Sequence, residues 1–69
     1  MTKQLVNTDY VIYDKENDKV ARWFSDDDII IFGDKSEAKQ DARRNEIVIP
    51  CTDLPKHWQD ELIKQINKH

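Results

Sequence analysis

Three consecutive aspartates, Asp26, Asp27 and Asp28, form the densest group of potential metal ligands in the chain. Hard cations such as Mg²⁺ and Ca²⁺ bind several carboxylate oxygens at once. Consecutive side chains of an extended segment point to opposite sides, however, and this stretch lacks the alternating ligands, glycine and distal glutamate of an EF-hand loop. The sequence favours a solvated turn that protects the isoleucine-rich segment after it from aggregation. We therefore expect no metal or cofactor site.

Other residues that could take part in catalysis also have simpler interpretations. Residues 37–39 match the Glu-x-Lys half of a metal-dependent nuclease motif, but side chains two positions apart in a helix do not face each other. His57 and His69 lack a carboxylate at a diagnostic spacing. Cys51 would need a histidine and an orienting group to act as a nucleophile, and a buried filler at a strand end is the better interpretation. We predict no catalytic residue; a metal-dependent hydrolase would require two or more carboxylates to converge in the fold.

The charge of the chain is unevenly distributed. Residues 9–28 contain seven acids against three bases, whereas residues 35–44 contain two acids and four cations, Lys35, Lys39, Arg43 and Arg44. The basic segment could follow nucleic-acid phosphates while Trp23 or a tyrosine stacks on a base. Cations interleaved with acids are more typical of a solvated helix face. Nucleic-acid binding is thus the alternative hypothesis.

Aromatic side chains give the strongest indication of a binding surface. Trp23 and Phe24 are neighbours, so they point to opposite faces of an extended segment. Tyr10 and Tyr13 are three positions apart and therefore also point to opposite faces. A sheet this small leaves part of the set exposed, and exposed aromatic patches often mark a partner or self-association surface. An ordinary core position fits Trp23 and Phe24 equally well. The residues expected to bind a protein partner are Tyr10, Tyr13, Trp23, Phe24, Asp26, Asp27 and Asp28.

Composition limits the architecture and the class of partner. The 69 residues suffice for one small domain, residues 1–69, with residues 1–8 expected as a loose arm. The net charge of −3 predicts no general affinity for nucleic acid or anionic membrane. Cys51 is the only cysteine, which favours a reducing compartment. With no segment resembling a signal peptide or a membrane span, we expect a cytoplasmic protein with no membrane partner.

Hydrophobic patterning predicts a sheet built from short strands. Apolar runs at residues 10–13, 20–24 and 29–32 are separated by acidic turns, which favours an antiparallel meander. Residues 29–32 are apolar at every position, and this predicts the central strand. Residues 47–49 should form a fourth strand that Pro50 ends.

Two helices should complete the fold. Asp34 with Glu37 has the spacing of a capping box, so we predict a short helix over residues 35–43 with Asn45 as its C-cap. A second helix should begin near Asp53 or Leu54, with Pro55 in its first turn. Its apolar face, with a residue at every fourth position, should cover the core: Leu54, Trp58, Leu62 and Ile66.

The expected junction between the third strand and the short helix is similar in sequence to a stretch of other small proteins. Residues 30–38, with the sequence Ile-Ile-Phe-Gly-Asp-Lys-Ser-Glu-Ala, resemble a stretch found in many very small uncharacterised proteins of bacteria and their phages. The resemblance implies an accessory protein of a phage or mobile element that acts on a host protein. It implies no activity, ligand or site residue.

These observations predict an α+β domain. A three- or four-stranded antiparallel meander should carry the C-terminal helix on one face and a short helix between the third and fourth strands. The function expected first is a non-enzymatic protein-binding module or accessory regulator, as a monomer or a dimer, whose acidic surface would steer a basic partner.

Overall fold

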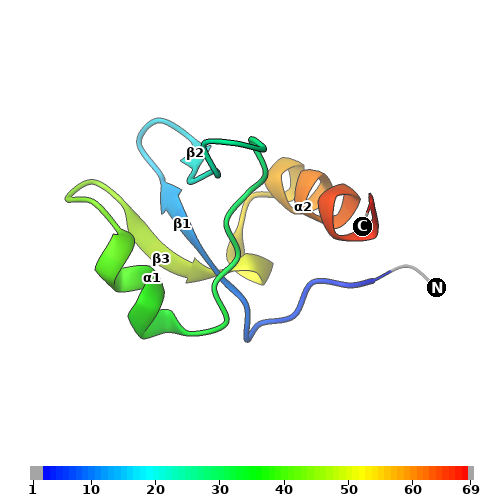
Figure 1. Cartoon of the computed structure of the whole chain (residues 1–69), viewed down its shortest axis with the longest axis horizontal. Coiled ribbons are helices and arrows are strands. Elements are labelled where there is room, and N and C mark those ends of the chain that lie inside the picture. Colours follow the sequence, from blue (N-terminus) through cyan, green and yellow to red (C-terminus); the bar gives the residue numbers. More distant parts are fainter. Residues whose placement is uncertain (1–2, 69) are drawn as a thin grey trace.

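The computed structural model describes residues 3–68, which form an antiparallel three-stranded sheet with two α-helices (Figure 1). The strands are β1 (Tyr10–Asp14), β2 (Lys19–Val20) and β3 (Ile47–Pro50). The helices are α1 (Lys35–Asp41), the 3-10 helix η1 (Cys51–Asp53) and α2 (Lys56–Lys68). The predicted α+β class is therefore confirmed, and no helix within residues 3–68 is long and apolar enough to cross a membrane.

The first strand, β1, lies at the centre of the sheet. The strand order is β2-β1-β3, and Tyr13 faces Val20 on one side and Ile47 on the other. Val11 and Ile12 are consecutive and point to opposite faces, yet both are buried. Burial on both faces is typical of a central strand. The expected meander order and the central position of residues 29–32 are therefore wrong.

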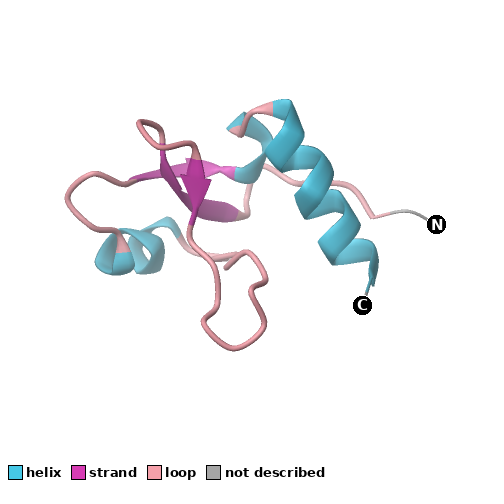
Figure 2. Cartoon of the chain, turned by 90° about the horizontal axis from the view of Figure 1, so that it is seen from above, coloured by secondary structure: helices cyan, strands magenta, loops and turns pink. Residues whose placement is uncertain are grey.

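Between Ala21 and Phe32 the chain leaves the sheet and returns to it. The Ala21 N–H donates to the Ile12 carbonyl at 2.9 Å, and Phe32 exchanges backbone hydrogen bonds of 2.7 and 2.8 Å with Tyr10. Arg22 and Ile29 form only an isolated bridge. Figure 2 shows the loop after β2 projecting from the sheet. The expected strands at 20–24 and 29–32 are thus replaced by the two-residue β2 and isolated bridges.

A side chain of α2 takes the place of a strand beside Ile29. Gln65 Oε1 accepts the Ile29 N–H at 2.8 Å, and Gln65 Nε2 donates to the Ile29 carbonyl at 2.9 Å. Buried backbone groups need such partners, and Ile29 is only 1% exposed. The primary amide of Gln65 therefore satisfies both backbone groups of Ile29.

The short helix α1 begins as expected and ends earlier. Asp34 is its N-cap, and one carboxylate oxygen accepts the Ser36 N–H at 2.8 Å. Ala42 is extended and forms the C-cap, so the helix ends at Asp41 rather than Arg43, and the expected C-cap at Asn45 is wrong. Ala38 is its one buried residue, and the helix lies against β1 and β3.

The C-terminal helix begins two or three residues later than expected from its apolar pattern. Leu54 ends η1, and α2 starts at Lys56, directly after Pro55. The Pro55 carbonyl accepts the N–H groups of Trp58 and Gln59, both at 3.0 Å. Pro55 thus lies at the helix start, where its missing N–H costs nothing.

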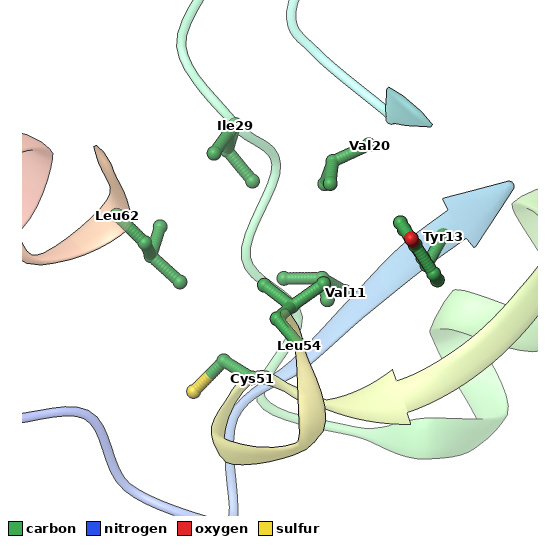
Figure 3. Packing of buried hydrophobic residues seen from close by; sticks show 7 residues of the cluster. All are labelled: Val11, Tyr13, Val20, Ile29, Cys51, Leu54 and Leu62. Atoms are coloured by element: carbon green, nitrogen blue, oxygen red, sulfur yellow. The ribbon is translucent and has the colours of Figure 1, made fainter. Parts of the chain in front are cut away.

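One hydrophobic cluster joins the sheet to α2 (Figure 3). Leu62 of α2 is fully buried, and Trp58 packs against the cluster from the same helix. In Figure 3, Ile29 lies between Leu62 and Val20, and all three belong to this cluster. The buried members are Val11, Tyr13, Val20, Ile29, Cys51, Leu54 and Leu62.

Residues 3–8, part of the segment expected as a loose arm, contain no helix or strand but are held against the rest of the fold. The Lys3 N–H donates to Asn67 Oδ1 at 2.7 Å, and Asn67 Nδ2 donates to the Lys3 carbonyl at 3.2 Å. Leu5 packs against the hydrophobic cluster. Residues 1 and 2 of the expected arm lie outside the described residues.

Candidate functional site

Residues 23–28, the aromatic loop, are ordered by their own backbone hydrogen bonds. The Trp23 N–H donates to the Asp28 carbonyl at 2.8 Å, and the Asp27 N–H donates to the Trp23 carbonyl at 3.0 Å. Asp27 has a φ of 59°, in the left-handed region that aspartate tolerates better than most residues. The sequence at this position therefore suits a closed turn.

Arg22 fastens the base of the aromatic loop to α2. Its Nη1 donates to the Asp27 carbonyl at 2.8 Å, and its Nη2 donates to Glu61 Oε1 at 3.0 Å. The guanidinium lies 5.3 Å from the centre of the Trp58 ring, within the range of a cation–π interaction. One side chain thus holds the loop backbone, a carboxylate and an aromatic ring together.

The aromatic loop displays two large apolar side chains to solvent. Phe24 is fully exposed, at 107% of its reference area, and Trp23 is 56% exposed. Asp26 and Asp27 are exposed beside them, whereas Asp28 is half-buried. The loop is therefore an apolar tip with an acidic rim, and Phe24 gains nothing from burial in the folded monomer.

The two tyrosines expected in the binding surface belong instead to the sheet. Tyr13 is only 7% exposed, and its hydroxyl donates to Asp18 Oδ1 at 2.7 Å. Tyr10 is half-buried at the start of β1. The structure thus brings Trp23, Phe24 and the three aspartates together on one loop and leaves both tyrosines outside it.

Asp18 is a structural junction that the sequence did not reveal. Besides the Tyr13 hydroxyl, Oδ1 accepts Trp58 Nε1 at 2.8 Å, and Oδ2 lies 2.9 Å from His57 Nε2. The hydrogen bond from Tyr13, then those from Trp58 and His57, lower the pKa of Asp18, and the same Tyr13 bond raises the pKa of the tyrosine. The helix partners lie 39 and 40 positions away, so no local spacing signals them. The junction ties the β1–β2 turn to α2.

Cys51, Glu37 and Lys39, three of the residues considered for catalysis, form no hydrogen bond or ion pair with one another in the part of the chain that is described. Cys51 is 1% exposed, its thiol donates to the Val6 carbonyl at 3.0 Å, and burial raises its pKa, which favours the unreactive thiol. Glu37 and Lys39 are exposed on α1, and His69 lies outside the described residues. Residues 3–68 contain no group of three or more His, Cys, Asp or Glu that could hold a metal ion.

The basic residues are exposed but only two of them lie on α1. Lys35 and Lys39 belong to the helix, whereas Arg43 and Arg44 follow its end. The Arg43 backbone N–H donates to Glu46 Oε1 at 2.8 Å. Within residues 3–68, none of the four side chains forms an ion pair.

A pocket of about 360 Å³ opens beside the edge strand β3. Its lining includes Tyr13 and Ile47, which are paired across β1 and β3. Ile47 is 46% exposed, so an apolar side chain borders the opening. The complete lining is Tyr13, Lys15, Ile47, Ile49, Asp53 and Pro55.

Comparison with known proteins finds no match for this chain among protein-family models, curated proteins or solved structures.

Proposed function

We propose that the chain is a non-enzymatic protein-binding module that presents the aromatic loop to a partner. The observation that carries this proposal is Phe24, a fully exposed aromatic side chain on a hydrogen-bonded loop. Folding alone gives no reason for an apolar ring in that position, because its exposure forgoes the hydrophobic stabilisation that burial supplies. Transfer of this ring into a partner's pocket would recover the hydrophobic stabilisation.

The rest of the loop suits the same role. Trp23 lies beside Phe24, and aromatic residues dominate the energetic centres of protein interfaces. Because Arg22 and the backbone bonds hold the loop before binding, association orders few additional groups. Asp26 and Asp27 would accelerate encounter with a basic surface and leave a salt-dependent association rate.

The partner that fits this chemistry is a protein with an apolar pocket and a basic rim. The likeness of residues 30–38 to proteins of bacteria and their phages supports a bacterial host protein as the partner, bound by an accessory regulator from a phage or mobile element. Tyr10 and Tyr13 would support the sheet beneath the surface rather than contact the partner.

A comparative capture experiment tests this proposal. Wild-type protein, Phe24→Ala and the control Val6→Ala are immobilised and exposed to bacterial lysate; Val6 is also an exposed apolar residue, at 46%, but lies outside the loop. A protein retained by wild type and control is identified by mass spectrometry, purified and titrated by calorimetry. We expect Phe24→Ala to weaken binding at least about 30-fold, as for an interface hot spot. Equal retention by all three proteins would overturn the proposal.

Nucleic-acid binding is the second candidate, supported by four exposed cations that form no ion pair within residues 3–68: Lys35, Lys39, Arg43 and Arg44. Binding of this kind weakens steeply with salt, because each phosphate contact releases counterions. A titration of labelled single- and double-stranded oligonucleotides at low ionic strength tests it. The absence of any binding there would eliminate this function.

A further inference from the structure

We propose that Glu61 of α2 is a positioning residue for the aromatic loop and acts on the loop through Arg22. This inference rests on the proposed function, because it concerns how the loop that binds a partner is held in its binding conformation. Glu61 Oε1 accepts Arg22 Nη2 at 3.0 Å across 39 positions of the chain, and Arg22 Nη1 donates to the Asp27 carbonyl at 2.8 Å. A residue of the helix thus orients the side chain that holds the loop.

The hydrogen bond from Arg22 reaches the residue of the loop whose backbone is strained. Asp27 has a φ of 59°, and residues other than glycine adopt this left-handed conformation at an energetic cost. The Asp27 N–H closes the turn onto the Trp23 carbonyl at 3.0 Å, so Phe24 lies within the turn that Asp27 completes. A fixed Asp27 carbonyl therefore favours the loop conformation that presents Phe24.

Arg22 contacts the backbone of Asp27 more closely than it contacts the carboxylate. The Asp27 carboxylate lies 4.0 Å from Arg22 Nη1 and its side chain is 86% exposed, so this ion pair contributes little. The carboxylate of Glu61 is closer, at 3.0 Å. Two nitrogens of the planar guanidinium thus reach acceptors on two separate segments, and the single ammonium group of a lysine does not reproduce this geometry.

Trp58 supports the guanidinium from a third direction. The centre of its ring lies 5.3 Å from Arg22 Cζ, and its Nε1 donates to Asp18 Oδ1 at 2.8 Å. Trp58 also packs against the hydrophobic cluster, so the ring beside Arg22 is itself held in place. Without Glu61, Arg22 would keep this ring but lose the acceptor that orients its second nitrogen. The loop should then open more often, and its ordering on binding would lower the affinity for a partner.

Amide hydrogen exchange followed by NMR tests this role without a partner. Protection of the Trp23 and Asp27 N–H groups reports the closed loop, whereas protection of the Phe32 N–H, which donates to the Tyr10 carbonyl at 2.8 Å, reports the sheet. Glu61→Ala should accelerate exchange of the two loop amides about 2- to 10-fold, as expected for the loss of one hydrogen bond. Exchange of the Phe32 amide should stay unchanged, which a general loss of stability would not allow.

Three further variants show whether Glu61 acts through Arg22. Glu61→Gln keeps an acceptor oxygen and should restore most of the protection, and Asp60→Ala, at the exposed neighbouring position of α2, is the matched control. In the background of Arg22→Met, Glu61→Ala should have no additional effect, because residues that act through one contact are not additive. Equal exchange in Glu61→Ala and Asp60→Ala, no recovery in Glu61→Gln, or further acceleration in the Arg22→Met background would each overturn the inference.

Calorimetric titration with the protein retained in the capture experiment gives the functional result. Glu61→Ala should raise the Kd at least about 2-fold, the smallest cost of ordering one additional side chain, and Glu61→Gln should recover the affinity. An unchanged Kd in Glu61→Ala would overturn the positioning role while the proposed function stands. If no protein is retained through Phe24, the proposed function fails instead, and the exchange rates still decide whether Glu61 holds the loop.

Discussion

Replacing Gln65 tests how α2 holds the irregular segment that leads out of the aromatic loop. Gln65→Met keeps the length and much of the volume of the side chain but removes both hydrogen bonds to Ile29. Because Ile29 is 1% exposed, its N–H and carbonyl lose their partners in a site with little access to water. The variant thus isolates the polar contribution of one amide.

The expected loss of stability is large for a chain of this size. An unsatisfied buried polar group costs about 1–3 kcal/mol, so two such groups should lower the free energy of unfolding by at least about 2 kcal/mol. Small domains have total stabilities of only about 5–15 kcal/mol. For a domain of 60–100 residues, a loss of 2 kcal/mol corresponds to a fall in Tm of roughly 8–16 °C.

Thermal and urea unfolding, followed by circular dichroism, measure this loss. Lys64→Met is the matched control, because Lys64 is the exposed neighbour of Gln65 on the same helix. Gln65→Glu should give an intermediate value, since a carboxylate still accepts the Ile29 N–H but cannot donate to its carbonyl. If Gln65→Met is no less stable than Lys64→Met, the amide does not support the segment and the reasoning fails.

Three further predictions concern the core, the polar junction and the loop. Leu62→Ala should lower the free energy of unfolding by about 2–5 kcal/mol in urea titrations, because the side chain is fully buried, and a loss below 1 kcal/mol would contradict its core role. Folding lowers the pKa of Asp18, so its stabilising contribution is complete above the usual value of 3.8 and is lost as pH falls through the folded pKa. The difference in urea midpoint between wild type and Asp18→Asn should therefore shrink in acid, and a constant difference would refute the charged junction. Phe24→Ala should change the free energy of unfolding by less than about 0.5 kcal/mol, and a larger loss would mean that the ring packs in the monomer.

Local signals in the sequence predicted several elements well. Asp34 marked the start of α1, Pro50 ends β3, and the four-residue period of Leu54, Trp58 and Leu62 identified the C-terminal helix. Each of these features depends on residues within about one or two turns of each other. Such patterns are visible without knowledge of the tertiary fold.

The strand order depended on information that local patterns do not carry. Residues 10–13 and 29–32 are both apolar throughout, so the rule that selected 29–32 as the central strand applied equally to 10–13. What separates them is the side chain of Gln65, which satisfies the Ile29 backbone from 36 positions away. A polar helix residue gives no sign in the sequence that it will replace a strand partner.

The candidate site was predicted only in part, because local patterns do not carry the strand order on which some of its features depend. The proximity of Trp23, Phe24 and the aspartates follows from their adjacency in the chain, and an exposed aromatic patch was expected from the small size of the sheet. The burial of Tyr13 follows from its pairing with Val20 and Ile47, and this requires the central position of β1. Alternation along a strand could not distinguish the covered tyrosine from the exposed phenylalanine.

Solution NMR mapping tests the central claim, that the aromatic loop is the binding surface. The protein retained in the capture experiment is titrated into isotopically labelled chain, and amide chemical shifts are followed residue by residue. We predict that the largest changes fall on residues 23–28, with Phe24 and Trp23 at their centre. Changes confined to residues 35–44, with the loop signals unmoved, would contradict the claim.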